Sequence, residues 1–545
     1  MSIVKTKYVF VTGGVTSSLG KGVVTASLGM LLKSRGYKIF LLKLDPYLNI
    51  DSGTLNPYEH GECFVTKDGL ETDMDLGHYE RFLNQTTTKE NNITSGFIYK
   101  TVIDNERKGI YLGKTVQVIP HITDEIKKHI KKIGKFGYDI IIVEIGGTIG
   151  DIEVLPYIEA VRQLKWELKK FNGLMIHLTL LPFISATGEI KTKPTQHSVR
   201  NLMENGIQVD IIVCRTSSHI SNYIKKKIAL FCNVQSVNVI ESIDTKIIYE
   251  IPYLLHMQNF DQMVLNFLNL KSIKTKTKNF YLEHWKSFIK KYKNPKYKVK
   301  IALVGKYVTL HDSYKSIRES LIHAGTINDI YVQIKWIYSE NIIKEENIQK
   351  IFKNISGILI APGFGKRGVK GKILAVKYAR ENKIPFLGIC LGMQISVIEF
   401  ARNVLGIKDA DSSEVNPLTP NPVIDLMNKQ KNILYKGGTM RLGDWKCSLV
   451  KDSKLFSIYK KKYIVERHRH RYEFNNKYID IFSRAGMKIV GINPETNLVE
   501  ALELKNHIFF IGVQYHPEYK STVINPHPLF ISFVLFSKKY KSYDI

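Results

Sequence analysis

The sequence predicts an α/β protein with two doubly wound domains. Short apolar runs alternate with amphipathic helical patterns in both halves of the chain. A glycine-rich loop follows the first apolar run, and in the second half a cysteine stands between two glycines at a strand-to-helix turn. The length of 545 residues is enough for two or more domains, each with its own hydrophobic core.

The first apolar run is followed by the glycine-rich loop at 13–22 and by a helix predicted at 23–34. A strand predicted at 38–44 completes a β–α–β unit. Backbone N–H groups at the start of such a helix can hold phosphates, with Lys21 as the point charge. The match to the Walker A pattern is incomplete, because Gly22 replaces the usual hydroxyl residue and the first glycine stands one position too early. A simple tight turn is the alternative.

Two acidic positions in the first half are candidate metal ligands. The apolar strand that begins at Ile140 ends in Glu144 beside two glycines. A carboxylate at that end of a strand is where α/β sheets hold a Mg²⁺ that bridges phosphates, and a lone acid there needs a partner. Asp75 lies in an acidic cluster at 71–80, where a helix cap or a solvated surface is the alternative.

A polar loop is predicted at 191–197, with two lysines and several hydroxyl groups. It could hold a triphosphate, although an exposed loop without a ligand is the alternative. Further strands are predicted at 177–180 and 210–214, so the first half reads as a nucleotide-binding domain. From about residue 271 to 300 the chain is rich in Lys, Tyr and Asn, which predicts a connector with one helix.

The second half restarts the alternation, with strands predicted at 300–305, 331–337 and 355–361. Cys390 then occupies the nucleophile position of a strand–turn–helix elbow. Gly388 and Gly392 would allow the strand and the helix to approach closely, and the N–H of Leu391 at the helix start can face an oxyanion. Gly363, in the turn after the last of these strands, could supply a second donor.

His516 and Glu518 near the C-terminus are a candidate base and its orienter for a thiol nucleophile. The interpretation places His516 on a strand. The two side chains would share a face only if that strand continues past Pro517. A structural role is the alternative for an isolated histidine or cysteine.

The net charge of +29 at pH 7 raises the possibility of nucleic-acid binding. The lysines are spread along the chain rather than gathered in one patch, so we expect no nucleic-acid partner, and positive charge also suits nucleotide substrates. Five cysteines without a CxxC pair favour a reducing compartment. No apolar run has the length of a membrane span and the start lacks a signal-peptide pattern, so we expect no membrane partner and a cytoplasmic location.

The motifs together resemble the CTP synthase family, and the resemblance covers nearly the whole chain. In the second half, GICLG at 388–392 and HPE at 516–518 are similar to class I glutamine amidotransferases. The motifs that resemble the family's synthetase domain lie at 13–22, 43–47, 75–82, 143–148 and 191–196, and the run at 467–473 completes the set.

The resemblance implies that ATP phosphorylates the uracil O4 of UTP and that ammonia displaces the phosphate to give CTP. Mg²⁺ would accompany ATP on Asp75 and Glu144. The implied ATP contacts are Ser18, Leu19, Gly20, Lys21, Gly22, Val23 and Asp75, with an adenine contact at Ile243, Asp244 and Thr245. The implied UTP or CTP contacts are Ser17, Asp151, Ile152, Glu153, Lys191, Thr192, Lys193, Pro194, Thr195, Gln196 and Lys227.

In the second half the resemblance implies that Cys390 attacks the side-chain amide of L-glutamine, with His516 moving protons and Glu518 orienting it. Arg471 suits the substrate carboxylate and Glu414 its ammonium group. The implied glutamine contacts are Gly363, Leu391, Gly392, Met393, Gln394, Glu414 and Arg471. The other members of the 467–473 run could form a surface charge cluster.

The family also uses GTP as an allosteric activator, is inhibited by CTP, and forms a homotetramer. Two positions depart from relatives. Pro362 replaces a glycine and has no N–H, so the oxyanion donors should be Gly363 and Leu391. Ile110 stands where relatives carry an acid, which bears on the strength of GTP activation.

The predicted boundaries are a synthetase domain at 1–270, a linker with a helix at 271–299 and an amidotransferase domain at 300–545. Two other functions remain open on the motifs: an amidotransferase coupled to a different ATP-dependent amination, and a basic nucleic-acid-binding or filament-forming protein.

Overall fold

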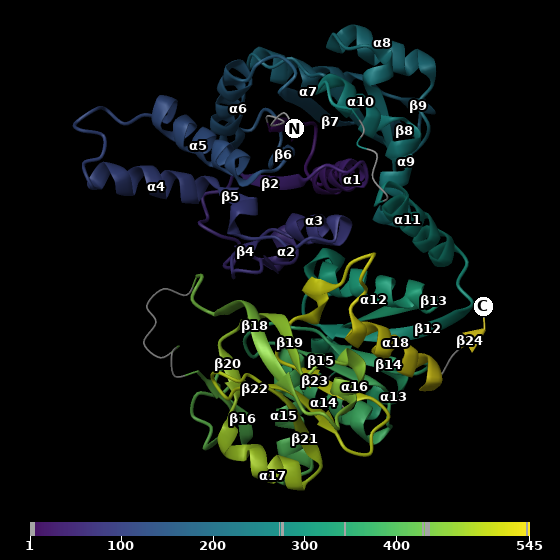
Figure 1. Ribbon diagram of the computed structural model, residues 1–545. Helices are drawn as coiled ribbons and strands as arrows, with labels where there is room; N and C mark the ends of the chain where they lie inside the picture. Colours follow the sequence, from purple (N-terminus) through teal and green to yellow (C-terminus); the bar gives the residue numbers. More distant parts are fainter. Residues whose placement is uncertain are drawn as a thin grey trace. The chain divides into compact units, whose positions relative to one another are not determined.

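The computed structural model describes residues 6–271, 273, 277–342, 345–427, 430, 437–540 and 543–544 (Figure 1). The chain divides into two compact units. The first takes residues 1–51 and 78–289, and the second takes residues 52–77 and 290–545. Each unit is built around a sheet with helices on both faces, so the predicted class of two doubly wound α/β domains is confirmed.

The first unit has a seven-stranded sheet in the order β11-β10-β7-β1-β6-β2-β5, and its pairings are parallel. The apolar runs of the sequence form its central strands, because a parallel sheet covered on both faces buries nearly every side chain. The strands are β1 (Lys7–Gly13), β2 (Ile39–Asp45), β5 (Asn92–Thr94), β6 (Ile140–Ile145), β7 (Gly173–Leu180), β10 (Ile211–Thr216) and β11 (Val239–Ile243).

Helices cover both faces of this sheet. On one face, alternate strand residues such as Phe10 and Val143 share a core with five helices. These are α4 (Ser95–Arg107), α5 (Thr123–Ile133), α6 (Leu155–Glu167), α7 (Lys193–Glu204) and α8 (Asn222–Cys232). On the other face lie α1 (Lys21–Ser34), α9 (Ile251–Met257) and α10 (Phe260–Phe267).

The stretch at 191–197, predicted as a loop, is mostly helical. Helix α7 begins at Lys193, with Pro194 in its first turn, where a proline costs no hydrogen bond. A short hairpin of β8 (Phe183–Ile184) and β9 (Glu189–Ile190) precedes it. The loop prediction was wrong because the polar residues here cover one face of the helix while Thr195 and Val199 are buried on the other.

One helix, α11 (Thr277–Lys293), occupies the predicted connector. The indole of Trp285 is buried, with ring centroids 5.1 Å from Phe82 and 5.6 Å from Tyr249. Phe288 packs on Tyr249 as well. The aromatic face of this helix therefore belongs to the first unit.

The second unit has a ten-stranded mixed sheet whose main path is β13-β12-β14-β15-β23-β22-β21-β18-β19, with β24 paired to β12. The first five strands of the path are parallel, and antiparallel strands follow. Their bounds are β12 (Tyr297–Gly305), β13 (Ile330–Tyr338), β14 (Gly357–Ile360), β15 (Phe386–Ile389), β18 (Arg441–Leu449), β19 (Tyr463–His470), β21 (Met487–Ile492), β22 (Val499–Leu504), β23 (Phe510–Val513) and β24 (Tyr543–Asp544).

Two hydrophobic cores lie on the two faces of this sheet. One is shared with α13 (Ile348–Ile351), α14 (Val369–Glu381), α15 (Leu391–Asn403), α17 (Ile479–Arg484) and a small sheet of β16 (Ala410–Ser412), β17 (Asn421–Leu426) and β20 (Tyr472–Phe474). The other is shared with α12 (Lys315–Ile327), α16 (Lys454–Tyr459) and α18 (Pro528–Tyr540).

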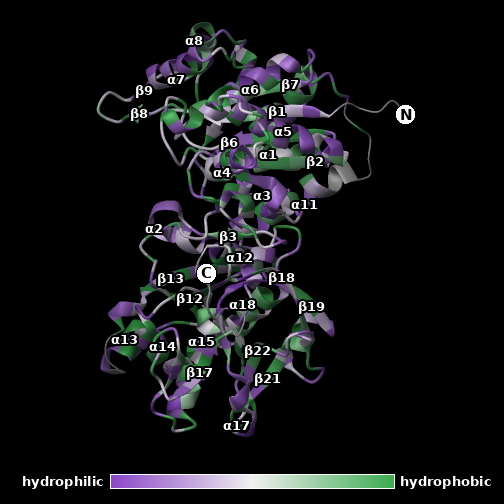
Figure 2. Ribbon diagram, turned by 90° about the vertical axis from the view of Figure 1, so that its left-hand side faces the viewer, coloured by the Kyte–Doolittle hydropathy of each residue, from purple (hydrophilic) through white to green (hydrophobic). Residues whose placement is uncertain are grey.

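Figure 2 shows hydrophilic and hydrophobic residues interleaved along helices such as α13 and α14. Such helices bury one side and expose the other. Within the ranges that the structure describes, no helix is both long enough and apolar enough to cross a membrane.

The second unit also includes residues 52–77, which the sequence placed in the synthetase half. This segment holds α2 (Pro57–His60), the hairpin of β3 (Phe64–Val65) and β4 (Glu71–Thr72), and the start of α3 (Asp75–Leu83). The chain thus leaves the first unit after residue 51 and returns to it at residue 78.

Candidate active sites

Cys390 lies between β15 and α15 with φ 51° and ψ −106°, a strained conformation for a residue with a side chain. The predicted elbow is confirmed. A Cβ on Gly388 would lie 2.7 Å from the carbonyl carbon of Gly392, and one on Gly392 would lie 2.4 Å from the carbonyl oxygen of Ile360. The two glycines therefore allow β15 and α15 to approach each other closely, with Cys390 at the turn between them.

His516 does not lie on a strand, so that part of the interpretation was wrong. Strand β23 ends at Val513, and Pro517 begins a 3₁₀ turn over Pro517–Lys520. This turn, rather than a continued strand, brings His516 Nδ1 to 2.7 Å from Glu518 Oε1. Both side chains are buried, which favours the contact over hydration of either group.

Burial lowers the pKa of His516, but the negative charges of Glu518 and Cys390 outweigh this effect and raise the pKa to about 10. The imidazole therefore carries its proton throughout the neutral range. Its Nε2 atom is buried and has no hydrogen-bond partner among the described residues. Gln514 Nε2 donates to Cys390 Sγ at 3.7 Å, and the thiol lies 3.7 Å from the carbonyl oxygen of Arg469.

A cavity of about 190 Å³ opens onto these groups. Cys390, His516 and Gly363 line it, as do Gly53 and Cys63 from the 52–77 segment. The cavity lies entirely within the second unit. Its size suits a small polar side chain rather than a nucleotide.

The 52–77 segment is held against the rest of the second unit by buried polar contacts. Glu62 Oε2 accepts hydrogen bonds from the N–H and the hydroxyl of Ser316, at 2.8 and 2.7 Å. Arg469 Nε donates to Glu71 Oε1 at 2.7 Å. Tyr519, next to Glu518, donates from its hydroxyl to the carbonyl of Cys63 at 3.0 Å. The segment is therefore a wall of the cysteine cavity.

The alternative that 467–473 forms a surface charge cluster was wrong for most of the run. Arg467, His468 and His470 are buried, because they lie on β19 with side chains alternating between two filled spaces. Arg467 Nη1 donates to the carbonyl of Val65 at 3.0 Å. On the other side His468 Nδ1 and His470 Nε2 lie 2.8 Å apart.

The residues implied to bind glutamine differ in their contacts and in whether they line the cavity beside Cys390. Gln394 Nε2, in the first turn of α15, donates to the carbonyl of Tyr472 at 2.9 Å. Glu414 Oε1 accepts from the N–H of Gly365 at 2.7 Å. Arg471 is bonded to Gln430 at 2.6 Å. The described walls of the cavity include Gly363 but neither Glu414 nor Arg471.

In the first unit, the loop after β1 has left-handed conformations at Val15, Ser18 and Gly20, with φ of 77°, 55° and 91°. Such conformations turn successive N–H groups toward one side and make an anion-binding concavity. Lys21 begins α1, and its Nζ donates to the carbonyl of Gly147 at 2.7 Å. Ser17 in this loop is exposed.

Arg215 at the end of β10 was missed by the sequence analysis. Its Nη1 donates to the carbonyl of Ser18 at 2.7 Å, and its Nε donates to Asp244 Oδ1 at 2.9 Å. It therefore joins the loop to the implied adenine contact at Asp244. A single arginine at a strand end belongs to no recognisable motif, so only the parallel order of the strands could have suggested this role.

Glu144 on β6 is fully buried. Lys43 Nζ donates to its Oε1 at 2.8 Å, and the hydroxyl of Tyr79 donates to its Oε2 at 2.5 Å. A carboxylate at the carboxyl end of a central strand is a group that can bind a Mg²⁺ ion or one of its water ligands, in competition with these two contacts. Asp75 opens α3 and is assigned to the second unit.

Most of the residues implied to bind UTP or CTP follow the carboxyl ends of β6 and β7, whereas Ser17 follows β1 and Lys227 lies on α8 after β10. Asp151, Ile152 and Glu153 are exposed, as are Lys193 and Lys227, whereas Lys191 is half-buried and contacts Glu189. The side chains of Thr192, Thr195 and Gln196 are buried and bonded within the protein, Thr195 to Thr179 at 2.7 Å and Gln196 to Thr192 at 3.1 Å. After β11, which ends at Ile243, Thr245 is bonded to the carbonyl of Ile247 at 2.8 Å.

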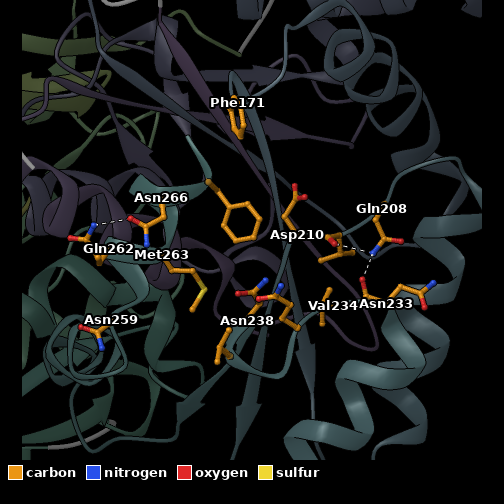
Figure 3. Close-up of a pocket in the computed structure, with 14 residues that line it drawn as sticks. Phe171, Gln208, Asp210, Asn233, Val234, Asn238, Asn259, Gln262, Met263 and Asn266 are labelled. Atoms are coloured by element: carbon orange, nitrogen blue, oxygen red, sulfur yellow. Dashed lines mark hydrogen bonds between the residues drawn. The ribbon is translucent and has the colours of Figure 1, made fainter. Parts of the chain in front are cut away.

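A cavity of about 680 Å³ lies at the opposite end of the same strands (Figure 3). Phe171 precedes β7, Asp210 precedes β10 and Asn238 precedes β11, so the cavity is at the amino ends of the strands. It is separate from the glycine-rich loop, because that loop follows the carboxyl end of β1.

Residues 7–270 match the family model described as "CTP synthase N-terminus", and residues 309–536 match "Glutamine amidotransferase class-I". The chain is 60% identical to a CTP synthase of Christiangramia forsetii, over 97% of this chain and 96% of the relative. It is 59% identical to that of Flavobacterium psychrophilum, over 99% of both. The chain belongs to the CTP synthase family. It is thus a ligase that carries a class I glutamine amidotransferase domain.

Among solved structures, a similar one is the glutaminase domain of a Trypanosoma brucei CTPS with bound acivicin. It is 36% identical to this chain, with a TM-score of 0.42, and the match covers 45% of this chain and 96% of that one.

Proposed function

We propose that the chain catalyses the ATP-dependent amination of UTP to CTP, with ammonia released from L-glutamine and with a 4-phosphorylated UTP intermediate. The observation that carries the proposal is the pairing of His516 with Glu518 beside Cys390 on a strained elbow, in a chain that belongs to this family over nearly its full length. The reaction would be the last step of de novo CTP synthesis.

In the glutaminase half, the sulfur of Cys390 attacks the carbonyl carbon of the glutamine side-chain amide. The carbonyl oxygen becomes an oxyanion, which the N–H groups of Gly363 and Leu391 face. His516 gives its proton to the leaving ammonia, and Glu518 holds the ring in place. Water then attacks the thioester carbon and gives a proton to His516, the C–S bond breaks, and glutamate leaves as the sulfur of Cys390 is released. The glutamine contacts are Gly363, Leu391, Gly392, Met393, Gln394, Glu414 and Arg471.

In the synthetase half, the γ-phosphoryl group of ATP passes to the uracil O4 of UTP. The left-handed loop and Lys21 bind the ATP phosphates by N–H donation and charge. Asp75 and Glu144 would hold Mg²⁺, which when bound neutralises phosphate charge. Ammonia then attacks C4, and the phosphate leaves as inorganic phosphate. Three lysines suit the triphosphate of UTP or of the inhibitor CTP, because their side chains are exposed or half-buried: Lys191, Lys193 and Lys227.

We assign the synthetase to residues 1–270, the linker to 271–299 and the amidotransferase to 300–545. Residues 52–77 belong to the synthetase range but line the glutaminase cavity. The proposal includes activation by GTP, inhibition by CTP, a homotetramer and a cytoplasmic location. Ile110, exposed in the loop after α4, occupies the position where relatives carry an acid. We therefore expect the strength of GTP activation in this chain to differ from that in relatives with the acid.

The test is CTP formation by the purified chain with ATP, UTP and Mg²⁺, once with L-glutamine and once with an ammonium salt. The proposal fails if neither nitrogen donor gives CTP. A panel of other acceptors, including cobyrinate-type and purine nucleotide acceptors, then separates it from an amidotransferase of another pathway.

A further inference from the structure

We propose that Lys372 is a positioning residue of the glutaminase half, which holds the loop at 361–364 and stabilises negative charge at Cys390. The inference rests on the proposed role of Cys390 as the nucleophile. It concerns a lysine that none of the motifs includes.

Lys372 lies on α14 and is fully buried. Its Nζ donates to the carbonyl of Ala361 at 3.4 Å. A Cβ built on Gly363 would lie 3.9 Å from this Nζ and 3.7 Å from Leu391 Cδ2. The ammonium group therefore lies next to Gly363, one of the two residues that the proposed mechanism uses as oxyanion donors.

A second lysine holds the other end of the same loop. Lys306, which directly follows β12, donates from Nζ to the carbonyl of Phe364, and its Cε would lie 3.4 Å from a Cβ on Gly363. The carbonyls on both sides of Pro362 and Gly363 are thus bonded to ammonium groups. This fixes the direction of the peptide groups in the loop, so the N–H of Gly363 is positioned without a rearrangement when the oxyanion forms.

Four charged or titratable groups act on Lys372. Burial and the charges of Lys306 and Arg367 together lower its pKa to about 7, against the opposing effects of Cys390 and Glu414. Lys372 and Cys390 thus interact electrostatically, and a charged Lys372 stabilises negative charge that forms at the sulfur or at the oxyanion during the reaction. A methionine would fill this space at lower desolvation cost, so a buried lysine here points to a role other than stability.

The experiment compares three variants of the full chain. Lys372→Met removes the charge and the donor at similar volume, and Lys372→Gln removes the charge but keeps a donor. Lys370→Met changes an exposed lysine on the same helix and is the matched control. The readouts are glutaminase kcat and KM, ammonia-dependent CTP formation, and the rate at which iodoacetamide alkylates Cys390 between pH 5 and 9, with Cys390→Ala as the blank.

We expect Lys372→Met to lower glutaminase kcat by about 10- to 100-fold with a smaller change in KM, because the loss falls on a charge that forms in the reaction. Alkylation of Cys390 at pH 7 should slow about tenfold in both Lys372 variants and stay unchanged in Lys370→Met. Retained ammonia-dependent activity shows that the protein has folded.

The inference is overturned if iodoacetamide alkylates Cys390 in Lys372→Met at the wild-type rate. It is also overturned if Lys372→Gln has both the glutaminase kcat and the alkylation rate of the wild type. If Lys372→Met does not fold, Lys372→Gln decides the matter alone. Failure of the proposed function looks different, because the wild-type chain would then lack glutaminase activity or alkylation would be the same in Cys390→Ala.

Discussion

The two units present their reactive groups in opposite ways. In the first, the glycine-rich loop is exposed from Val15 to Ser18 at the carboxyl ends of the strands. In the second, Cys390, His516 and Glu518 are only 2%, 3% and 1% exposed. An open edge suits two large polyanions, whereas a small cavity lined by buried groups suits one small amide that must react away from bulk water.

The two regions also differ in what their charged groups contact without substrate. Lys21 is bonded to the carbonyl of Gly147, and Lys43 is bonded to Glu144, so arriving phosphates or a metal ion must compete with these contacts. The His516–Glu518 contact, by contrast, already has the geometry that the mechanism uses.

The largest effect should come from Cys390→Ala. Glutamine-dependent CTP formation should fall by more than about 1,000-fold, because the proposed thioester forms on the sulfur of Cys390. Ammonia-dependent CTP formation should stay within about threefold of the wild type, because the synthetase half does not use the thiol. Equal losses with both nitrogen donors would mean that the two regions are not separate in function.

Lys21→Ala should act on the other region. CTP formation should fall by about 100- to 1,000-fold with either nitrogen donor, because the phosphates lose their point charge. Alkylation of Cys390 by iodoacetamide should stay at the wild-type rate. Lys38→Ala, at an exposed lysine before β2, is the control and should keep full activity. A change in Cys390 alkylation in Lys21→Ala would contradict the separation.

Arg469→Ala should destabilise the wall of the cysteine cavity. It leaves Glu71 buried without its cation, so the free energy of unfolding should fall by about 3 kcal/mol. Limited proteolysis should then cut within residues 52–77 faster than in the wild type. The double variant Glu71→Ala/Arg469→Ala should lose less than the sum of the two single losses, and additive losses would show that the pair does not interact.

Glu518→Gln should have a smaller effect, of about 10- to 100-fold on glutaminase kcat. Glu518 raises the pKa of His516, so the variant should lose the imidazolium at a lower pH than the wild type, which keeps it up to about pH 10. The thiol should therefore react more slowly with iodoacetamide at pH 7 to 9. An unchanged pH profile of alkylation would mean that Glu518 only packs against the ring.

The elbow at Cys390 could be predicted because its determinants are local. An apolar strand, two glycines four residues apart and a helix follow one another in the chain, and the clashes at Gly388 and Gly392 explain why no larger residue fits. The loop before Lys21 and the strand that ends in Glu144 were predictable on the same ground. The contact between His516 and Glu518 was foreseen, but its geometry was not, because Pro517 starts a turn instead of interrupting a strand.

The docking of residues 52–77 could not be predicted from local sequence. Its contacts join residues hundreds of positions apart, such as Glu62 with Ser316 and Glu71 with Arg469. The buried position of Lys372 was missed for a related reason. A lysine in a helix with other lysines is typical of a solvated face, and only the packing of α14 against the loop at 361–364 reveals the exception.

The detour of the chain through residues 52–77 limits how genes of this family can recombine. An exchange that replaces only the C-terminal half would take Arg467, Arg469 and Ser316 from one relative. Residues 52–77, which these three residues contact, would then come from another relative. Chimeras between distant relatives should therefore have higher glutaminase activity when residues 52–77 and the C-terminal half come from the same relative. They should have lower activity when the one junction lies near residue 290. The glutaminase is inherited as two separate stretches of sequence that must evolve together.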